Sequence, residues 1–234
     1  MVGEIIMLTI QNLRYQIAQS DIIKDFNLHL PKGKIFTLFG ASGCGKSTLL
    51  RCVAGILESE SGIIDSAKNA FVFQEHSLFE NLNALENVAV VMDSPDYAWI
   101  LEQFALLFLS KKDALKYPSE LSGGMRARVA FVRALAYNAP LLLLDEPFSG
   151  LDSQVKRILI EKLLDRVQNH NHSALLVTHD ALESCLISDE IYFLKPRFME
   201  VEKVVHLGVA QNLRNENFIN ETLKTHFNNR IYFE

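Results

Sequence analysis

Hydrophobic and polar residues alternate along the first part of the chain, as they do in half-buried β-strands. The alternation runs through residues 7–14 and again through residues 22–30. Residues 31–33, Pro-Lys-Gly, predict a turn. Residues 34–39 then form a short apolar run that is typical of a buried strand. This part of the chain is therefore predicted to consist of strands joined by turns.

The pattern changes to helical spacing in the middle of the chain. Residues 85–92, 97–109 and 121–137 each have apolar side chains three or four positions apart. No strand pattern occurs between these segments. We therefore expect an inserted helical unit over residues 80–138.

Strand patterns return after the helical segments. Residues 141–144 are four consecutive leucines, and residues 174–178 and 191–194 are further short apolar runs typical of buried strands. A helical pattern separates the first run from the second, and this order predicts a mostly parallel sheet in an α/β fold. The predicted division is an α/β core over residues 1–79 and 139–195 and a C-terminal extension over residues 196–234.

Composition narrows the class of protein. The 234 residues carry a formal net charge of −5, which argues against nucleic acid as a partner because nucleic-acid coats need a basic face. Hydrophobic residues make up 49% and charged residues 22%, as in an ordinary folded domain. The mean hydropathy of +0.10 is slightly high and indicates an apolar surface that a partner covers.

Segments that insert into a membrane are not expected. No apolar stretch approaches the roughly 20 residues of a membrane span. Residues 1–10 contain Glu4 and lack the basic region of a signal peptide. Met7 is an alternative to Met1 as the first residue of the protein. The three cysteines have neither metal-ligand nor disulfide spacing, which favours a reducing cytosol.

A glycine-rich loop follows the apolar run 34–39. Gly40-x-x-x-x-Gly45-Lys46-Ser47 matches the Walker A pattern, with a predicted strand before it and helical spacing after it. Glycines let consecutive backbone N–H groups approach a phosphate, and the helix start adds positive charge. Lys46 is expected to reach the β- and γ-phosphates, and the Ser47 hydroxyl to bind Mg²⁺. The predicted ATP-binding residues here are Gly40, Ala41, Ser42, Gly43, Cys44, Gly45, Lys46, Ser47 and Thr48.

Two acidic residues follow the run of four leucines. This placement is typical of a Walker B strand, in which Asp145 holds Mg²⁺ directly or through water. Glu146 would then polarise the water that attacks the γ-phosphate. The alternative is a surface turn, but four preceding leucines favour the edge of a buried sheet.

The segment Leu121-Ser122-Gly123-Gly124-Met125 predicts a second anion-binding helix start. Ser122 is a favourable N-cap residue. A glycine in a helix costs about 1 kcal/mol relative to alanine, so two together indicate a backbone that something approaches closely. The alternative is an ordinary capped helix.

In this order the motifs resemble those of the nucleotide-binding subunit of an ATP-binding cassette (ABC) transporter, with residues 121–124 as its signature motif. The resemblance runs from about Leu8 to Leu194. It implies a P-loop NTPase (RecA-like) α/β core, an N-terminal antiparallel β subdomain and an inserted α-helical subdomain. It also implies hydrolysis of ATP with Mg²⁺, and makes Glu146, His179 and Lys46 the catalytic residues.

The resemblance assigns roles to further residues. Tyr15 matches an aromatic residue that stacks on adenine, although a core tyrosine is the alternative. Gln74 matches the Q-loop glutamine, which contacts Mg²⁺ and the water and senses the transporter. His179 matches the switch histidine, which bonds the γ-phosphate. The matching D-loop residues at the dimer interface are Ser149, Gly150, Leu151 and Asp152.

The implied partners follow from the same family. Two copies are expected to form a head-to-tail dimer, with each ATP between Walker A of one copy and the signature motif of the other. Integral membrane permease subunits would dock near residues 74–85, and a solute-binding protein would act indirectly. The implied location is peripheral, on the cytoplasmic face of the inner membrane.

Residues 116–126 and 145–148 are most similar to bacterial importers of nitrate, sulfonate and taurine. Met125 and Ala127 stand where glutamine is usual in the wider family, and the stretch between Gly55 and Gln74 is short. The transported solute and the direction of transport therefore stay open. A non-transport ABC ATPase and a binding module without turnover are the alternatives.

Overall fold

The central sheet contains six strands in the order β5-β6-β7-β3-β8-β9. The structure, a computed structural model, describes residues 5–18, 20–75, 77–195 and 199–227. Neighbouring strands from β5 through β8 are parallel, whereas β9 pairs antiparallel with β8. The strands are β3 (Ile35–Phe39), β5 (Asn69–Val72), β6 (Leu141–Asp145), β7 (Ser173–Thr178), β8 (Glu190–Leu194) and β9 (Val201–His206).

The four leucines of β6 show why a strand in the middle of this sheet has an uninterrupted apolar sequence. Successive side chains of a strand point to opposite faces. Leu142 and Leu144 join the hydrophobic core on the side of the inserted helices, while Leu141 and Leu143 join the core beneath the N-terminal sheet. Both faces of the strand are thus covered, as expected for a parallel sheet.

A second, antiparallel sheet is formed by β1 (Ile6–Ile17), β2 (Ser20–Pro31) and β4 (Ser61–Ser66). Its buried face packs against the central sheet and against α1 (Lys46–Val53) in one core. This arrangement confirms the expected antiparallel N-terminal β subdomain on a P-loop NTPase fold.

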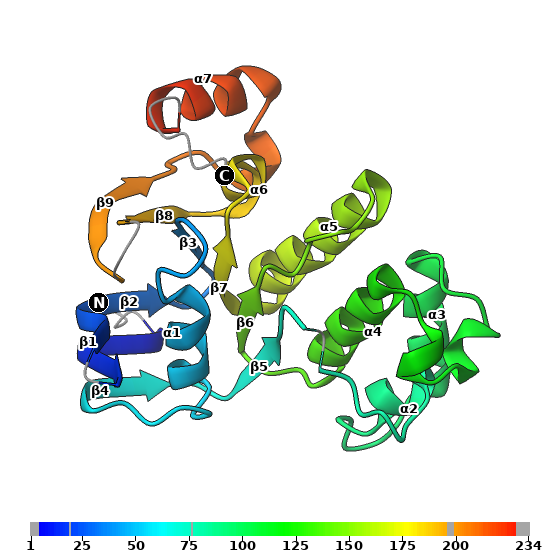
Figure 1. Cartoon of the computed structure of the whole chain (residues 1–234). Helices are drawn as coiled ribbons and strands as arrows, with labels where there is room; N and C mark the ends of the chain where they lie inside the picture. Colours follow the sequence, from blue (N-terminus) through cyan, green and yellow to red (C-terminus); the bar gives the residue numbers. More distant parts are fainter. Residues whose placement is uncertain (1–4, 19, 76, 196–198, 228–234) are drawn as a thin grey trace.

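The middle of the chain is helical. It contains α2 (Ala84–Ala89), α3 (Tyr97–Leu106) and α4 (Gly123–Ala136), with short 3₁₀ turns at Asp113–Leu115 and Pro118–Glu120. These elements form a group at one end of the molecule, away from β1, β2 and β4 (Figure 1). Residues 80–138, all of which the structure describes, contain no strand.

The helix predicted over residues 97–109 ends three residues early, at Leu106. Phe108 has a φ of 56°, in the left-handed region. An L-residue in that conformation cannot continue a right-handed helix. Phe104, within the helix, is fully buried in a hydrophobic core that the inserted helices share with one face of the central sheet.

The remaining helices are α5 (Ser153–His170), α6 (Ala181–Ile187) and α7 (Glu216–His226), with a 3₁₀ turn at Gln211–Leu213. Directly after α7, the ring centroid of Phe227 lies 4.9 Å from that of Phe39 and 5.0 Å from that of Phe193. Phe39 ends β3, so the last described residues support the strand that leads into the phosphate loop. None of the described helices is long and apolar enough to cross a membrane.

Replacing Phe104 with alanine is expected to destabilise the protein by about 3–5 kcal/mol, because the ring is 0% exposed and its removal leaves a cavity. The matched control is Phe108→Ala, since Phe108 is 55% exposed and its loss should change stability by only about 0.5 kcal/mol. Urea unfolding of both variants measures the difference. Equal losses would contradict the placement of these two rings.

Candidate functional site

The phosphate loop connects the end of β3 to the start of α1. Gly43 and Gly45 have φ values of 80° and 105°, a region that glycine adopts without strain. A Cβ atom on Gly45 would also lie 3.0 Å from Cγ2 and 3.2 Å from the carbonyl oxygen of Ile22. Both conformation and space therefore require glycine at this position.

Lys46 is buried against the loop that it follows. Its Nζ donates hydrogen bonds of 2.7 Å to the carbonyl oxygens of Gly40 and Ala41. The Sγ of Cys44 lies 3.7 Å from the same nitrogen. These contacts hold a buried positive charge against the phosphate loop, which suits an incoming phosphate.

Ser47, near the start of α1, lies beside Asp145, the last residue of β6. The Ser47 hydroxyl donates a 3.0 Å hydrogen bond to Oδ1 of Asp145. Burial raises the pKa of the Asp145 carboxyl, and the bond from Ser47 opposes that shift. Hydroxyl and carboxylate oxygens are the ligands that Mg²⁺ prefers, so this pair fits the predicted metal site.

Glu146 occupies a strained position directly after β6. Its φ is 47°, which is uncommon for a residue with a side chain. Its backbone N–H donates a 2.9 Å hydrogen bond to the carbonyl of Val177, and its Oε1 lies 3.0 Å from Nδ1 of His179. The register of the sheet explains this meeting, because Asp145 pairs with Val177 and both strands end at the same edge.

A cleft of about 330 Å³ lies beside the phosphate loop and Glu146. Gln74 and Glu146 both line it, whereas Asp145 and His179 are not among its lining residues. Tyr15 is not among its lining residues and packs instead against the core beneath the N-terminal sheet. The residues that line the cleft are Ile17, Ile22, Ser42, Gly43, Gly45, Lys46, Ser47, Thr48, Gln74 and Glu146.

The signature segment lies outside this cleft, and none of the cleft's described lining residues comes from it. Ser122 caps α4 by accepting a hydrogen bond from the N–H of Met125. A Cβ atom on Gly123 would meet nothing within 4 Å, and one on Gly124 would make an ordinary 3.7 Å contact with Leu151. The described fold itself therefore has room for a side chain at either glycine.

The proposed D-loop adjoins the signature segment. The carbonyl oxygen of Gly150 would lie 4.0 Å from a Cβ atom on Gly124. Asp152 caps α5 by accepting hydrogen bonds from the N–H groups of Gln154 and Val155. Ser149 donates its N–H to the carbonyl of Glu146, so this turn begins at the end of the Walker B strand.

Sequence reasoning missed a polar network behind His179. The Thr178 hydroxyl donates a 2.7 Å hydrogen bond to the buried Glu183, whose other oxygen lies 2.7 Å from Nζ of Lys156. Lys156 also lies 3.3 Å from Asp180, on the other side of the histidine. These contacts fix the backbone around His179. Their members lie on β7, α5 and α6, and spacing in the sequence gives no sign of the network.

The comparisons with known proteins agree with this geometry. The ABC transporter family pattern matches residues 23–149. The sulfate/thiosulfate import ATP-binding protein of Neisseria meningitidis is 39% identical over 79% of this chain and 57% of its own length. The aliphatic sulfonates import ATP-binding protein of Bacillus subtilis is 33% identical over 86% of this chain and 84% of its own length.

A solved structure shares the fold. The dimer of an ATP-binding cassette in a post-hydrolysis state, bound to ADP and Pi, has a TM-score of 0.78 at 28% identity. It covers 87% of this chain and is itself covered completely. Fold and site together define a P-loop nucleotide-binding protein. The chain belongs to the ABC transporter family, in its ATP-binding cassette, and spans 57% of the length of the sulfate/thiosulfate import relative.

The raised pKa of Asp145 has a consequence for stability. A carboxyl whose pKa is higher in the folded state stabilises the fold below its ordinary pKa of about 4, and this contribution is lost as pH rises through the folded pKa. Asp145→Asn stays neutral throughout. The variant should therefore gain stability relative to the natural protein as pH rises, and then keep a constant advantage.

Urea unfolding without nucleotide or Mg²⁺, repeated between pH 4 and 8, measures this difference. An advantage of 1 kcal/mol corresponds to a rise of roughly 0.3–1 M in the urea midpoint. Parallel stability curves for the two proteins at every pH would contradict a carboxyl destabilised by burial.

Proposed function

We propose that this protein is the ATP-hydrolysing nucleotide-binding subunit of an ABC transporter. The observation that carries the proposal is the pair formed by Glu146 and His179, 3.0 Å apart, at the edge of a sheet that also presents the Walker A loop. A binding module without turnover has no need for a shielded carboxylate beside an imidazole. The alternative of a non-transport ABC ATPase uses the same chemistry and differs in its partner.

In the proposed reaction, Lys46 and the backbone N–H groups of its loop bind the phosphates. Glu146 accepts a proton from water as the water oxygen bonds to the γ-phosphorus and the bond to the β–γ bridging oxygen breaks. His179 donates a hydrogen bond to the γ-phosphate and holds the carboxylate in place. The products are ADP and inorganic phosphate.

The oxygens of Ser47, Asp145 and Gln74 would hold Mg²⁺ beside this site. When bound, Mg²⁺ neutralises phosphate charge and aligns the β- and γ-phosphates. Tyr15 remains our proposed contact for adenine, although it does not line the cleft, and the side chains of Ile17 and Ile22 give the cleft an apolar wall.

We propose that a second copy completes each nucleotide site. The cleft contains no residue of the signature segment among those described, and Gly123 and Gly124 are not required by the packing of their own chain. Their N–H groups, at the start of α4, suit the phosphates of a nucleotide held by a partner. Ser149, Gly150, Leu151 and Asp152 would lie at this interface.

The second proposed partner is a polytopic permease. Phe79 is exposed, and the buried Asn87 fixes its backbone with hydrogen bonds of 2.8 Å from the Phe79 N–H and 3.0 Å to the Phe79 carbonyl. Asn87 also donates to the carbonyl of Leu82, 2.8 Å away. A rigid apolar surface of Leu78, Phe79 and Leu82 fits a short helix of a membrane subunit. Permease docking would place the protein on the cytoplasmic face of the inner membrane.

The similarity to sulfate/thiosulfate and aliphatic sulfonates import proteins supports a bacterial importer of a small solute of the nitrate, sulfonate or taurine kind, served by a solute-binding protein.

We further propose that the chain is divided into three parts. The ATPase core comprises residues 1–79 and 139–195, the inserted helical subdomain residues 80–138, and the C-terminal extension residues 196–234.

Glu146→Gln tests the proposed chemistry. Removing the proton acceptor should lower ATP turnover in the assembled transporter by roughly 10²–10⁴-fold, while nucleotide affinity stays within a factor of two or so. Glu58→Gln, which alters an exposed carboxylate outside the cleft, is the control. Turnover by Glu146→Gln at the rate of the control would remove this residue from the reaction.

Gly123→Glu tests the shared site. The new side chain meets open space in its own chain, and a negative charge near a helix N-terminus is favourable, so folding should be unaffected. The carboxylate would face the phosphates of the opposite nucleotide. We expect ATP binding to the single copy to persist, whereas ATP-dependent dimerisation and turnover fall more than tenfold. Light scattering and phosphate release measure both, and unchanged dimerisation would exclude the proposed interface.

A further inference from the structure

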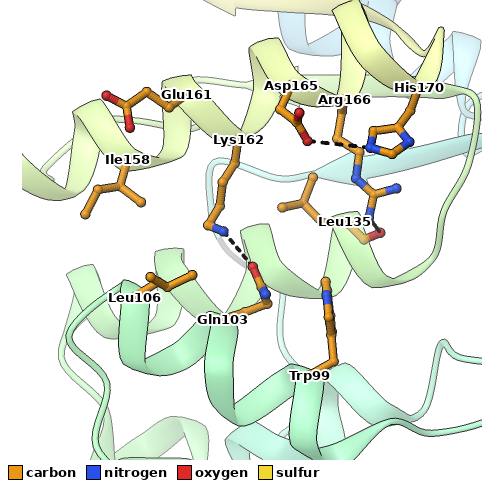
Figure 2. A pocket seen from close by; sticks show the side chains of 10 residues that line it. All are labelled: Trp99, Gln103, Leu106, Leu135, Ile158, Glu161, Lys162, Asp165, Arg166 and His170. Carbon is orange, nitrogen blue, oxygen red and sulfur yellow. Dashed lines mark hydrogen bonds and ion pairs between the residues drawn. The ribbon is translucent and has the colours of Figure 1, made fainter.

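A groove of about 640 Å³ lies between α5 and the inserted helices, on residues that the ATP site does not use. Figure 2 shows its two sides: Lys162 and Arg166 project from α5, while Trp99 and Gln103 project from α3. Leu135, near the end of α4, contributes to the wall. The volume is in the range of small-molecule sites.

Two positive charges in this groove are only partly compensated. Nζ of Lys162 donates a 2.6 Å hydrogen bond to the amide oxygen of Gln103. Arg166 donates to the side-chain oxygen of Asn138, 2.8 Å away, and to the carbonyl of Leu135, 3.1 Å away. All three acceptors are neutral. Within the described residues, neither cation has a carboxylate oxygen within the 4.0 Å of an ion pair.

Burial works against both charges. It lowers the pKa of Lys162 and the pKa of Arg166. A charged group that is taken out of water is destabilised, and here the attraction of Asp165, joined by that of Glu102 for Lys162, offsets only part of this cost. An anion placed beside the two cations would offset more of it. The two side chains are one helical turn apart on α5, so one anion can contact both.

The carboxylates around the groove limit how much negative charge it accepts. Glu161 and Asp165 also line it. Glu161 lies 3.7 Å from Arg157, and Asp165 lies 3.6 Å from Nε2 of His170, so each has a partner on its own helix. Both are exposed at the rim. They would repel a polyanion such as ATP more strongly than a ligand with one negative charge.

The remaining surface is apolar. The Trp99 ring, Leu106 and Ile158 line the groove together with Leu135. A flat aromatic or aliphatic body fits against an indole ring. We propose that this groove binds a small organic monoanion, a carboxylate or sulfonate with an apolar body, whose charged group contacts Lys162 and Arg166 and whose body packs on Trp99.

The position of the groove gives such a ligand a defined structural effect. Lys162 belongs to the helix that follows the D-loop, and Gln103 belongs to the inserted helices, so their hydrogen bond joins these two parts of the chain. A bound anion would compete with the Gln103 oxygen for the same ammonium group. The proposed ligand site therefore includes a hydrogen bond that joins the core, which contains the central sheet, to the inserted helices.

Trp99 is the one tryptophan in the sequence, so intrinsic fluorescence reports directly on this groove. The experiment titrates the full-length protein with benzenesulfonate and, in parallel, with methanesulfonate, and repeats both by calorimetry. Benzenesulfonate should give a saturable change in Trp99 emission, with an affinity at least tenfold above that of methanesulfonate. Equal affinities for the two would overturn the role of the aromatic wall.

Lys162→Gln should weaken benzenesulfonate binding by about tenfold or more, because a charge-assisted hydrogen bond is lost. Arg166→Gln should do the same, and thermal unfolding of each variant verifies that it is folded. Lys111→Gln, which removes an exposed cation outside the groove, is the control and should bind as the natural protein does. A response that does not saturate, or that is equal in Lys162→Gln and Lys111→Gln, would overturn the proposal.

Discussion

The parallel pairing of β7 with both β3 and β6 is the constraint on which the nucleotide cleft depends. In this register Phe39 lies beside Thr178, and Asp145 lies beside Val177. The residues that follow each strand are then brought to one edge: the phosphate loop after β3, Glu146 after β6 and His179 after β7. A shift of one residue in either pairing would separate the carboxylate from the imidazole and turn buried leucines toward the wrong core.

The central part of the fold was predictable from the sequence because it is buried on both faces. Residues 141–144 and 174–178 are unbroken apolar runs, and a sheet covered on both sides requires such runs. The strands β4 and β9 went unpredicted for the opposite reason. Both mix exposed and partly buried positions, so neither has an apolar face strong enough to give a pattern. The short helix α6 was missed as well, although Asp180 caps it.

Some residues of the candidate site were predictable from the sequence and others were not. Motifs that are contiguous in sequence, such as residues 40–48 and 145–146, could be assigned roles because their chemistry depends on local spacing. The network of Thr178, Glu183 and Lys156 could not, since its members come together only through tertiary packing. The apolar wall of Ile17 and Ile22 belongs to the same category: β1 and β2 must be paired before the wall exists.

The left-handed backbone at Glu146 places opposite demands on the residue for the stability of the fold and for ATP hydrolysis. A glycine there would relax the strained φ and remove the conformational penalty that a side chain imposes. The same exchange would delete the carboxylate that faces His179. Selection for a more stable fold therefore favours glycine at position 146, whereas selection for ATP turnover favours glutamate. Sequence libraries screened for thermal resistance alone should accordingly be enriched in inactive variants substituted at Glu146.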